Sequence, residues 1–226
     1  MAEQLIFDLP AIPALGREDF FVAPSNAMAV SMIDGDVVWP GGKLVLTGPA
    51  GSGKTHLAHV WAKRSGAQII AAQKVTEAQV PTLATAPVVI EDLPEIAHDA
   101  DALKAAFHLH NLVLANGHTL MMTGRAAPNL WDLTLPDLQS RVQAATHVAL
   151  EAPDDSLLTV VLAKLFADRQ ILPRPDVIPY LVRRMERSFQ SAAELVDILD
   201  RAALSESRTL TRALAHRVIS QRFDTE

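Results

Sequence analysis

The chain has 226 residues, 49% of them hydrophobic and 20% charged, and its formal net charge at pH 7 is −6. This composition excludes a disordered chain, and the acidic balance argues against wholesale nucleic-acid binding, which needs clustered Lys and Arg. There is no cysteine, so disulfides, thiolate metal sites and a cysteine nucleophile are excluded. Glu3 stands where a signal peptide would be basic, and no apolar run approaches the ~20 residues of a membrane helix. We therefore expect a cytoplasmic protein without a membrane segment.

The first notable segment is Gln4-Leu5-Ile6-Phe7-Asp8-Leu9, which places four large apolar residues next to a glutamine near the start of the chain. Ends of domains are usually disordered unless something ties them down. The segment is therefore expected either to pack on its own domain or to bind another protein. The residues alone leave both possibilities open.

Between residues 21 and 152, short apolar runs alternate with segments of helical spacing. Strands are expected at residues 43–47, 67–71, 87–90, 119–123 and 146–150, with helices at 55–64 and 101–115. Strands that are apolar on both faces and alternate with helices are typical of a parallel sheet covered by helices. We expect an α/β domain over residues 21–152, preceded by a leader at residues 1–20.

After residue 152 the strand pattern ends and only helical segments follow. These are expected at residues 154–169, 176–187, 191–205 and 209–222, with Asp154 and Ser191 as N-caps. Residues 153–226 are therefore expected to form a small all-α domain.

A phosphate-binding loop follows the first predicted strand, because residues 48–55 fit the pattern G-x-x-x-x-G-K-[ST]. Its glycines let backbone N–H groups surround the phosphates at a helix N-terminus. Lys54 would neutralise the β- and γ-phosphates, and the Thr55 hydroxyl would bind Mg²⁺. The alternative is a plain glycine-rich turn, but the preceding strand and following helix favour nucleotide binding. The predicted nucleotide-binding residues are Gly48, Pro49, Ala50, Gly51, Ser52, Gly53, Lys54 and Thr55.

Two acidic residues, Glu91 and Asp92, follow the third predicted strand. A P-loop ATPase needs one carboxylate beside the Mg²⁺ and usually a second one that positions the attacking water. Here the longer Glu91 has the metal-side position and the shorter Asp92 the water-side position. Misplacement by about 1 Å can cost about 100-fold in rate. We therefore expect nucleotide binding with weak or absent intrinsic hydrolysis.

Several motifs together resemble the DnaA/Hda family of AAA+ ATPases. Residues 48–57 (GPAGSGKTHL) are similar to the family's P-loop and add His56 to the nucleotide-binding residues. Residues 120–125 with Pro128 resemble the sensor-1 strand, with Thr123 near the γ-phosphate, and residues 195–203 resemble the lid helix. Residues 135–142 (LPDLQSRV) resemble the segment whose arginine, here Arg141, acts as a finger on a neighbour's nucleotide. Phe21-Val22 with Ser25-Asn26 resembles the segment that borders the adenine.

The resemblance implies an AAA+ domain with an all-α lid that binds ADP or ATP with Mg²⁺. The acidic charge, the length and the absence of a helix-turn-helix region after the lid favour an Hda-type regulator. Such a protein docks on the replicative sliding clamp, here through Gln4, Leu5, Phe7 and Leu9. With Arg141 it stimulates hydrolysis of ATP bound to the initiator DnaA, which prevents re-initiation. Sequence-specific DNA binding is not expected, and a homo-oligomer is plausible in this family.

Two other functions stay open at this point. One is an autonomous DnaA-like ATPase that remodels or loads a replication protein on single-stranded DNA, and the other is an adaptor whose nucleotide only stabilises the fold. The family's sensor-2 arginine falls at Gln190, which carries no charge, with Arg187 one turn away as a possible substitute. Two sets of residues are assigned structural or surface roles: the histidines His56, His59, His108 and His110, and the tryptophans Trp39, Trp61 and Trp131, which are expected in the core or in the nucleotide-pocket wall.

Overall fold

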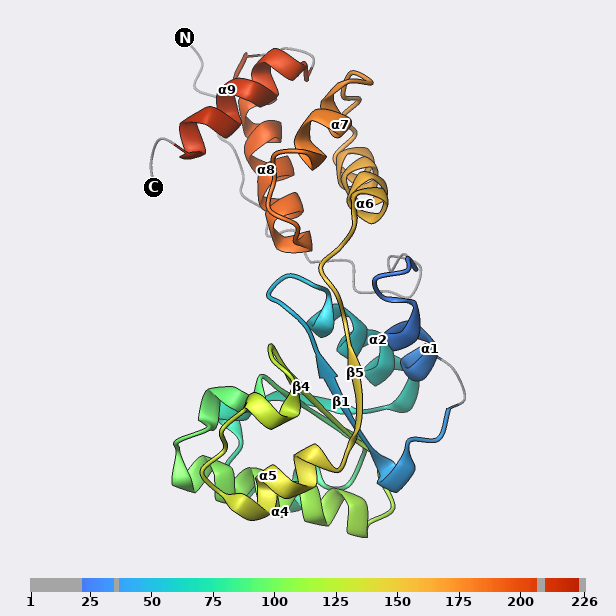
Figure 1. The fold of residues 1–226 in the computed structure, drawn as a ribbon, viewed down its shortest axis with the longest axis vertical. Helices are drawn as coiled ribbons and strands as arrows, with labels where there is room; N and C mark the ends of the chain where they lie inside the picture. Colours follow the sequence, from blue (N-terminus) through green and yellow to red (C-terminus); the bar gives the residue numbers. More distant parts are fainter. Residues whose placement is uncertain (1–21, 35–36, 207–209, 224–226) are drawn as a thin grey trace.

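A five-stranded parallel sheet forms the centre of the first part of the chain (Figure 1). The structure, a computed structural model, describes residues 22–34, 37–206 and 210–223, so the predicted clamp-binding segment lies outside the described residues. The strand order is β2-β3-β4-β1-β5. This confirms the predicted α/β class with a parallel sheet. The strands are β1 (Lys43–Thr47), β2 (Gln68–Ala71), β3 (Val88–Glu91), β4 (Leu120–Gly124) and β5 (Thr146–Ala149).

Helices cover both faces of the sheet. Because successive side chains of a strand point to opposite faces, Leu44 and Leu46 of β1 pack in one cluster and Val45 packs in another. The first cluster includes buried residues of α1 (Ala27–Asp34) and α2 (Lys54–Ser65). The second includes residues of α3 (Val80–Leu83), α4 (Ala100–Ala115) and α5 (Pro136–Gln143). The sheet is therefore the middle of three layers.

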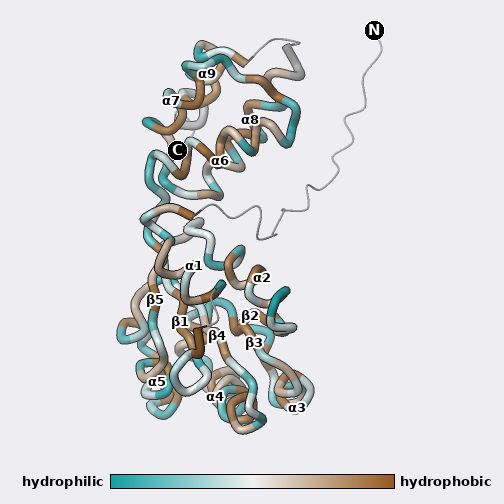
Figure 2. Tube along the Cα trace, turned by 90° about the vertical axis from the view of Figure 1, so that its right-hand side faces the viewer, coloured by the Kyte–Doolittle hydropathy of each residue, from teal (hydrophilic) through white to brown (hydrophobic). Residues whose placement is uncertain are grey.

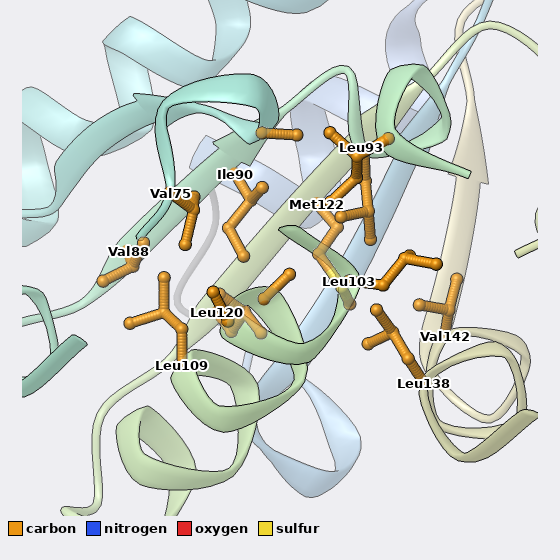
Figure 3. Close-up of a cluster of buried hydrophobic side chains, with 14 of the residues drawn as sticks. Val75, Val88, Ile90, Leu93, Leu103, Leu109, Leu120, Met122, Leu138 and Val142 are labelled. Atoms are coloured by element: carbon orange, nitrogen blue, oxygen red, sulfur yellow. The ribbon is translucent and has the colours of Figure 1, made fainter. Parts of the chain in front are cut away.

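The larger cluster is shown in Figure 3, where side chains of β3 and β4 meet those of α4 and α5. Ile90 and Met122 come from the strands, Leu103 from α4 and Leu138 from α5, and all four are almost completely buried. Full burial of one such side chain stabilises the folded state by about 1.5–3 kcal/mol. This packing fixes α5, and with it Arg141, against the sheet.

The rest of the chain is helical, with α6 (Asp155–Asp168), α7 (Val177–Val182), α8 (Phe189–Glu206) and α9 (Arg212–Phe223). Its core runs from Leu158 to Ile219 and contains no residue of the sheet. Figure 2 shows hydrophobic and hydrophilic residues alternating along these helices, as expected for helices that bury one face. No helix within residues 22–34, 37–206 and 210–223 is long and apolar enough to cross a membrane.

The helix bounds in this part correct two predictions. Asp154 is the N-cap of α6, as predicted, because its side chain accepts a hydrogen bond of 2.8 Å from the Leu157 N–H. Ser191 is not an N-cap, because α8 already begins at Phe189. The Ser188 hydroxyl instead accepts a hydrogen bond of 3.0 Å from the Ser191 N–H. The predicted helix at 176–187 is also shorter and ends at Val182.

Candidate functional site

The sheet order brings the predicted phosphate loop, sensor strand and acidic pair to one edge. The phosphate loop follows β1, Thr123 belongs to β4, and Glu91 ends β3, while β4 lies between β1 and β3. In the strand register Leu46 stands opposite Thr123, and Ile90 opposite Met122. Because the carboxyl ends of parallel strands share an edge, the three motifs are neighbours there, which is where open α/β sheets bind ligands.

The phosphate loop has a backbone shape that only glycine adopts easily. Gly51 and Gly53 have φ values of 66° and 96°, in the left-handed region. A Cβ atom on Gly48 would lie 2.6 Å from the Leu150 carbonyl oxygen. Helix α2 begins directly after Gly53, so its first N–H groups face the loop. This is the geometry of an anion-binding site at a helix N-terminus.

Lys54 folds back over the loop. Its Nζ atom donates hydrogen bonds to the carbonyl oxygens of Gly48 and Pro49, at 2.7 and 2.8 Å. Burial lowers the pKa of the Lys54 amino group, and the positive charge of Arg125 lowers it further, whereas Asp92 and Glu91 act in the opposite direction. The charge of Arg125, which follows β4, therefore acts on the loop lysine together with those of the two acids.

The two acids differ in their surroundings. One oxygen of Glu91, Oε1, is buried without a hydrogen-bond partner in the described part of the chain. Asp92 has a left-handed backbone, with φ 51° and ψ 47°, and its N–H donates to the Thr123 hydroxyl at 3.0 Å. A left-handed conformation is unfavourable for residues other than glycine, although Asp tolerates it better than most. The hydrogen bond to Thr123 ties the acidic pair to β4, the predicted sensor strand.

The residues present fit a nucleotide phosphate with its Mg²⁺. Four buried side-chain atoms have no hydrogen-bond partner among the described residues, and two of them, Ser52 Oγ and Glu91 Oε1, belong to this edge of the sheet; the others are Ser25 Oγ and His110 Nε2. Buried polar atoms without partners are rare in proteins, and a ligand is one of the explanations. Thr55 is exposed in the first turn of α2, and His56 is partly exposed beside it. Lys54, Ser52 and Thr55 could therefore hold phosphate oxygens, with Glu91 beside the metal.

The helical part of the chain touches the phosphate loop directly. The Phe189 N–H donates a hydrogen bond of 2.8 Å to the Gly51 carbonyl oxygen. A Cβ on Gly51 would lie 2.6 Å from Ser188 Cβ and 3.4 Å from Gln190 Cβ. Gln190, at the predicted sensor-2 position, thus lies beside the loop, and its amide donates to Glu194 at 2.9 Å. Arg187, the possible substitute, instead forms an ion pair of 2.7 Å with Asp155.

The segment predicted to border the adenine lies before α1. Val22 is exposed, while Ser25 and Asn26 are buried, and the Asn26 side chain accepts a hydrogen bond of 2.8 Å from the Ala23 N–H. The Glu151 N–H donates to the Ser25 carbonyl oxygen at 3.1 Å, which links this segment to the connection between β5 and α6. Phe21 lies outside the described residues.

Arg141 lies apart from the other predicted site residues. It is exposed in the last turn of α5, and its backbone carbonyl oxygen accepts a hydrogen bond of 2.8 Å from Lys43 Nζ. Lys43 is the first residue of β1, whereas the phosphate loop follows the last. Five residues of strand span about 16 Å, so the backbone of Arg141 and the loop are at opposite ends of β1.

The three tryptophans lie in the core, and His108 and His110 occupy the surface and structural positions expected of them. Trp39, Trp61 and Trp131 are buried, and the rings of Trp39 and Trp61 stack at 4.9 Å between centroids. Both also line a cavity of about 660 Å³ beside Gly41 and Gly42, at the amino end of β1 and away from the phosphate loop.

His108 contacts Glu77 at 2.9 Å, whereas His110 is buried. Among the described residues no three His, Cys, Asp or Glu side chains are grouped as metal ligands would be.

Sequence reasoning missed two features of this site. Arg125 was seen only as part of a motif, although its charge acts on Lys54. The contact of Ser188 and Phe189 with Gly51 was not predicted, because it joins segments far apart in the chain. The excess of small residues around position 51 is a weak signal for close backbone approach.

A parallel sheet with this strand order, a phosphate loop after β1 and acids after β3, followed by a helical region that contacts the loop, is the AAA+ P-loop fold. Comparison with solved structures shows which members are similar. Domain III of the Thermotoga maritima replication initiation protein DnaA superposes with a TM-score of 0.79 over 94% of this chain and 98% of its own, at 17% identity. AMPPCP-bound DnaA from Aquifex aeolicus gives a TM-score of 0.71 over 86% of this chain and 67% of its own, at 18% identity. The fold is thus DnaA-like.

Sequence comparison adds less. An uncharacterised protein of Haemophilus influenzae is 26% identical over 183 residues, which is 76% of this chain and 79% of that protein. No family model matches the chain.

Proposed function

We propose that this protein is a nucleotide-bound, Hda-type regulator that inactivates the replication initiator DnaA. In this proposal it docks on the DNA-loaded sliding clamp and stimulates hydrolysis of the ATP bound to DnaA through Arg141. Re-initiation of replication is thereby prevented. The DnaA-like fold supports a role in replication, and the position of Arg141 supports the mode of action.

The observation that carries the proposal is the separation of Arg141 from its own phosphate loop. An arginine finger must reach the transferred phosphoryl group, and Arg141 emerges at the other end of β1. It is exposed and therefore accessible to a second molecule. Its backbone is fixed by Lys43 and its helix by the packing of Leu138 and Val142. With its backbone fixed and its side chain exposed, Arg141 can extend its guanidinium to a partner's site and stabilise transition-state charge there.

The protein's own site supports tight binding rather than rapid turnover. Lys54, Ser52 and the glycine loop would hold the phosphates of ADP or ATP, and Mg²⁺, when bound beside Thr55 and Glu91, would neutralise their charge. Asp92 is held by its N–H bond to Thr123, in a left-handed conformation. Gln190 supplies no positive charge where the family has an arginine. We therefore expect the bound nucleotide to act mainly as a structural ligand.

The clamp contact is assigned to Gln4, Leu5, Phe7 and Leu9. A tethered peptide can insert its apolar side chains into a hydrophobic pocket while the glutamine forms a hydrogen bond at the rim. Gln4→Ala should therefore weaken clamp binding and leave nucleotide binding unchanged. Binding to clamp on DNA, measured by surface plasmon resonance, tests this assignment separately from the role of Arg141.

The test of the mechanism is phosphate release from ATP-bound DnaA with clamp loaded on DNA. Arg141→Ala should lose the stimulation, and Arg141→Lys should recover only part of it, because lysine lacks the planar fork of donors. Gln143→Ala, an exposed change on the same helix, serves as the matched control. Undiminished stimulation by Arg141→Ala would refute the mechanism.

A second function is favoured by one observation: the phosphate loop and both acids lie at the same edge of the sheet. An autonomous ATPase that remodels or loads a replication protein on single-stranded DNA would use this site for its own turnover. It predicts steady-state hydrolysis by the protein alone that is stimulated by single-stranded DNA and abolished by Lys54→Ala. Absence of turnover together with retained nucleotide binding would exclude it.

A further inference from the structure

An arginine-rich cluster lies in the helical region, in the part away from the sheet, where α7 and α9 contact each other (Figure 1). We propose that Arg184 and Arg212 form a binding site for the phosphate groups of a nucleic-acid backbone. The site does not depend on the proposed function, because all its residues belong to α7, α9 and the segment after α7.

The two guanidinium groups converge on a single aromatic ring. Arg184 Cζ lies 4.4 Å from the centroid of the Tyr180 ring, and Arg212 Cζ lies 5.1 Å from it. Since both distances end at the same centroid, the two Cζ atoms are no farther apart than these distances combined. Stacking on the ring orders both side chains, and an ordered guanidinium loses less entropy when it binds an anion.

Neither guanidinium is neutralised within the described part of the chain. The ion pairs formed there by arginines join Arg64 to Asp34, Arg169 to Asp197 and Arg187 to Asp155. Arg184 and Arg212 are both exposed and lie more than 4.0 Å from every described carboxylate oxygen. Arg212 is also the first residue of α9, where a positive charge does not favour the helix. Two neighbouring positive charges without an acid are the arrangement that a phosphate chain would neutralise.

The ring itself is a support and not a binding surface. Tyr180 is only 6% exposed, and its hydroxyl is joined to His216 Nδ1 by a hydrogen bond of 2.8 Å. A base cannot stack on a buried ring, so the site offers no direct means of reading bases. Contacts of this kind bind any sequence and depend strongly on salt. The site therefore adds non-specific backbone binding. The acidic net charge of the whole chain does not indicate such a local site.

The experiment measures binding of a fluorescently labelled 30-base-pair duplex to the full-length protein in excess ADP, over a range of salt concentrations. Each phosphate contact contributes about 0.9 to the slope of log K against log salt. The double variant Arg184→Gln/Arg212→Gln should therefore lower that slope by about 2. Between 50 and 200 mM salt, the unaltered protein should lose about 12-fold more affinity than the double variant.

Three controls separate the site from its alternatives. Arg201→Gln, an exposed arginine of α8 without an ion pair in the described part of the chain, should leave the slope unchanged. Arg184→Lys/Arg212→Lys keeps both charges and should preserve most of the slope. This variant distinguishes loss of the phosphate contacts from unfolding of the glutamine variant. An unchanged slope in the folded double variant would overturn the proposal. So would binding of a labelled polyglutamate peptide that needs both arginines while the duplex does not.

Discussion

The contact between Gly51 and Ser188 makes a prediction about how the helical region and the phosphate loop are coupled. In Gly51→Ala, the new Cβ would lie 2.6 Å from Ser188 Cβ and 2.9 Å from its hydroxyl. Alanine at φ 66° costs roughly 1–2 kcal/mol, and the overlap with Ser188 adds about 1–3 kcal/mol. The hydrogen bond from the Phe189 N–H to the Gly51 carbonyl is also at risk, because the two segments must separate.

A double-mutant cycle separates the backbone strain of alanine at position 51 from its overlap with Ser188. Ser188→Gly removes the clashing atom and, as a replacement of an N-cap by glycine, should cost only a few tenths of a kcal/mol. In the double variant only the backbone strain should remain. Gly51→Ala should therefore destabilise the protein by at least about 1 kcal/mol less when Ser188→Gly is also present.

The cycle compares the free energies of unfolding of the unaltered protein, the two single variants and the double variant, each measured by urea denaturation. Thr47→Ser, a conservative change at the end of β1, serves as a control for nearby substitutions. Additive effects within ~0.5 kcal/mol would show that Gly51 and Ser188 do not touch and would refute this account of the contact.

Three further predictions concern single side chains. Lys43→Met leaves the Arg141 carbonyl unpaired and should cost about 1.5–3 kcal/mol, with faster amide exchange at the end of α5; unchanged exchange would contradict the contact. Burial, together with Lys43 and Arg141, lowers the pKa of His110 below 6.5, so the unfolded state binds more protons and stability should fall as the pH drops below 6.5. His110→Leu should flatten that pH dependence in thermal melts, and an unaltered profile would exclude this cause. Asp154→Ala should lose about 1 kcal/mol through its cap on Leu157, measured by urea denaturation, and Asp154→Asn should lose much less.

The sheet could be predicted from the sequence because its strands are short apolar runs. Val88 to Ile90 and Leu120 to Met122 are buried on both faces, so composition alone marks them as central strands. Helices α1 and α3 were not predicted. Helix α3 has only four residues and contains Pro81, and α1 has eight residues without a charged residue in its first turn, so their local signals are weak.

For the candidate site, the sequence predicted the motifs and the sheet order made them neighbours. The phosphate loop and the acids after β3 could be predicted because their chemistry depends on local spacing. The bond from Lys43 to Arg141 could not, because the two residues are 98 positions apart and neither belongs to a recognisable pair. The same holds for Arg184 and Arg212, which meet only because α7 and α9 pack around Tyr180.

The most direct test of the central claim follows phosphate released from radiolabelled ATP preloaded on DnaA. The complete mixture contains this protein and sliding clamp loaded on DNA, and matched mixtures omit each component in turn. The account predicts rapid release only in the complete mixture, on the order of 10³-fold faster than without this protein. If the ATP on DnaA stays intact in the complete mixture while binding to the clamp is confirmed, the shared-site mechanism is wrong.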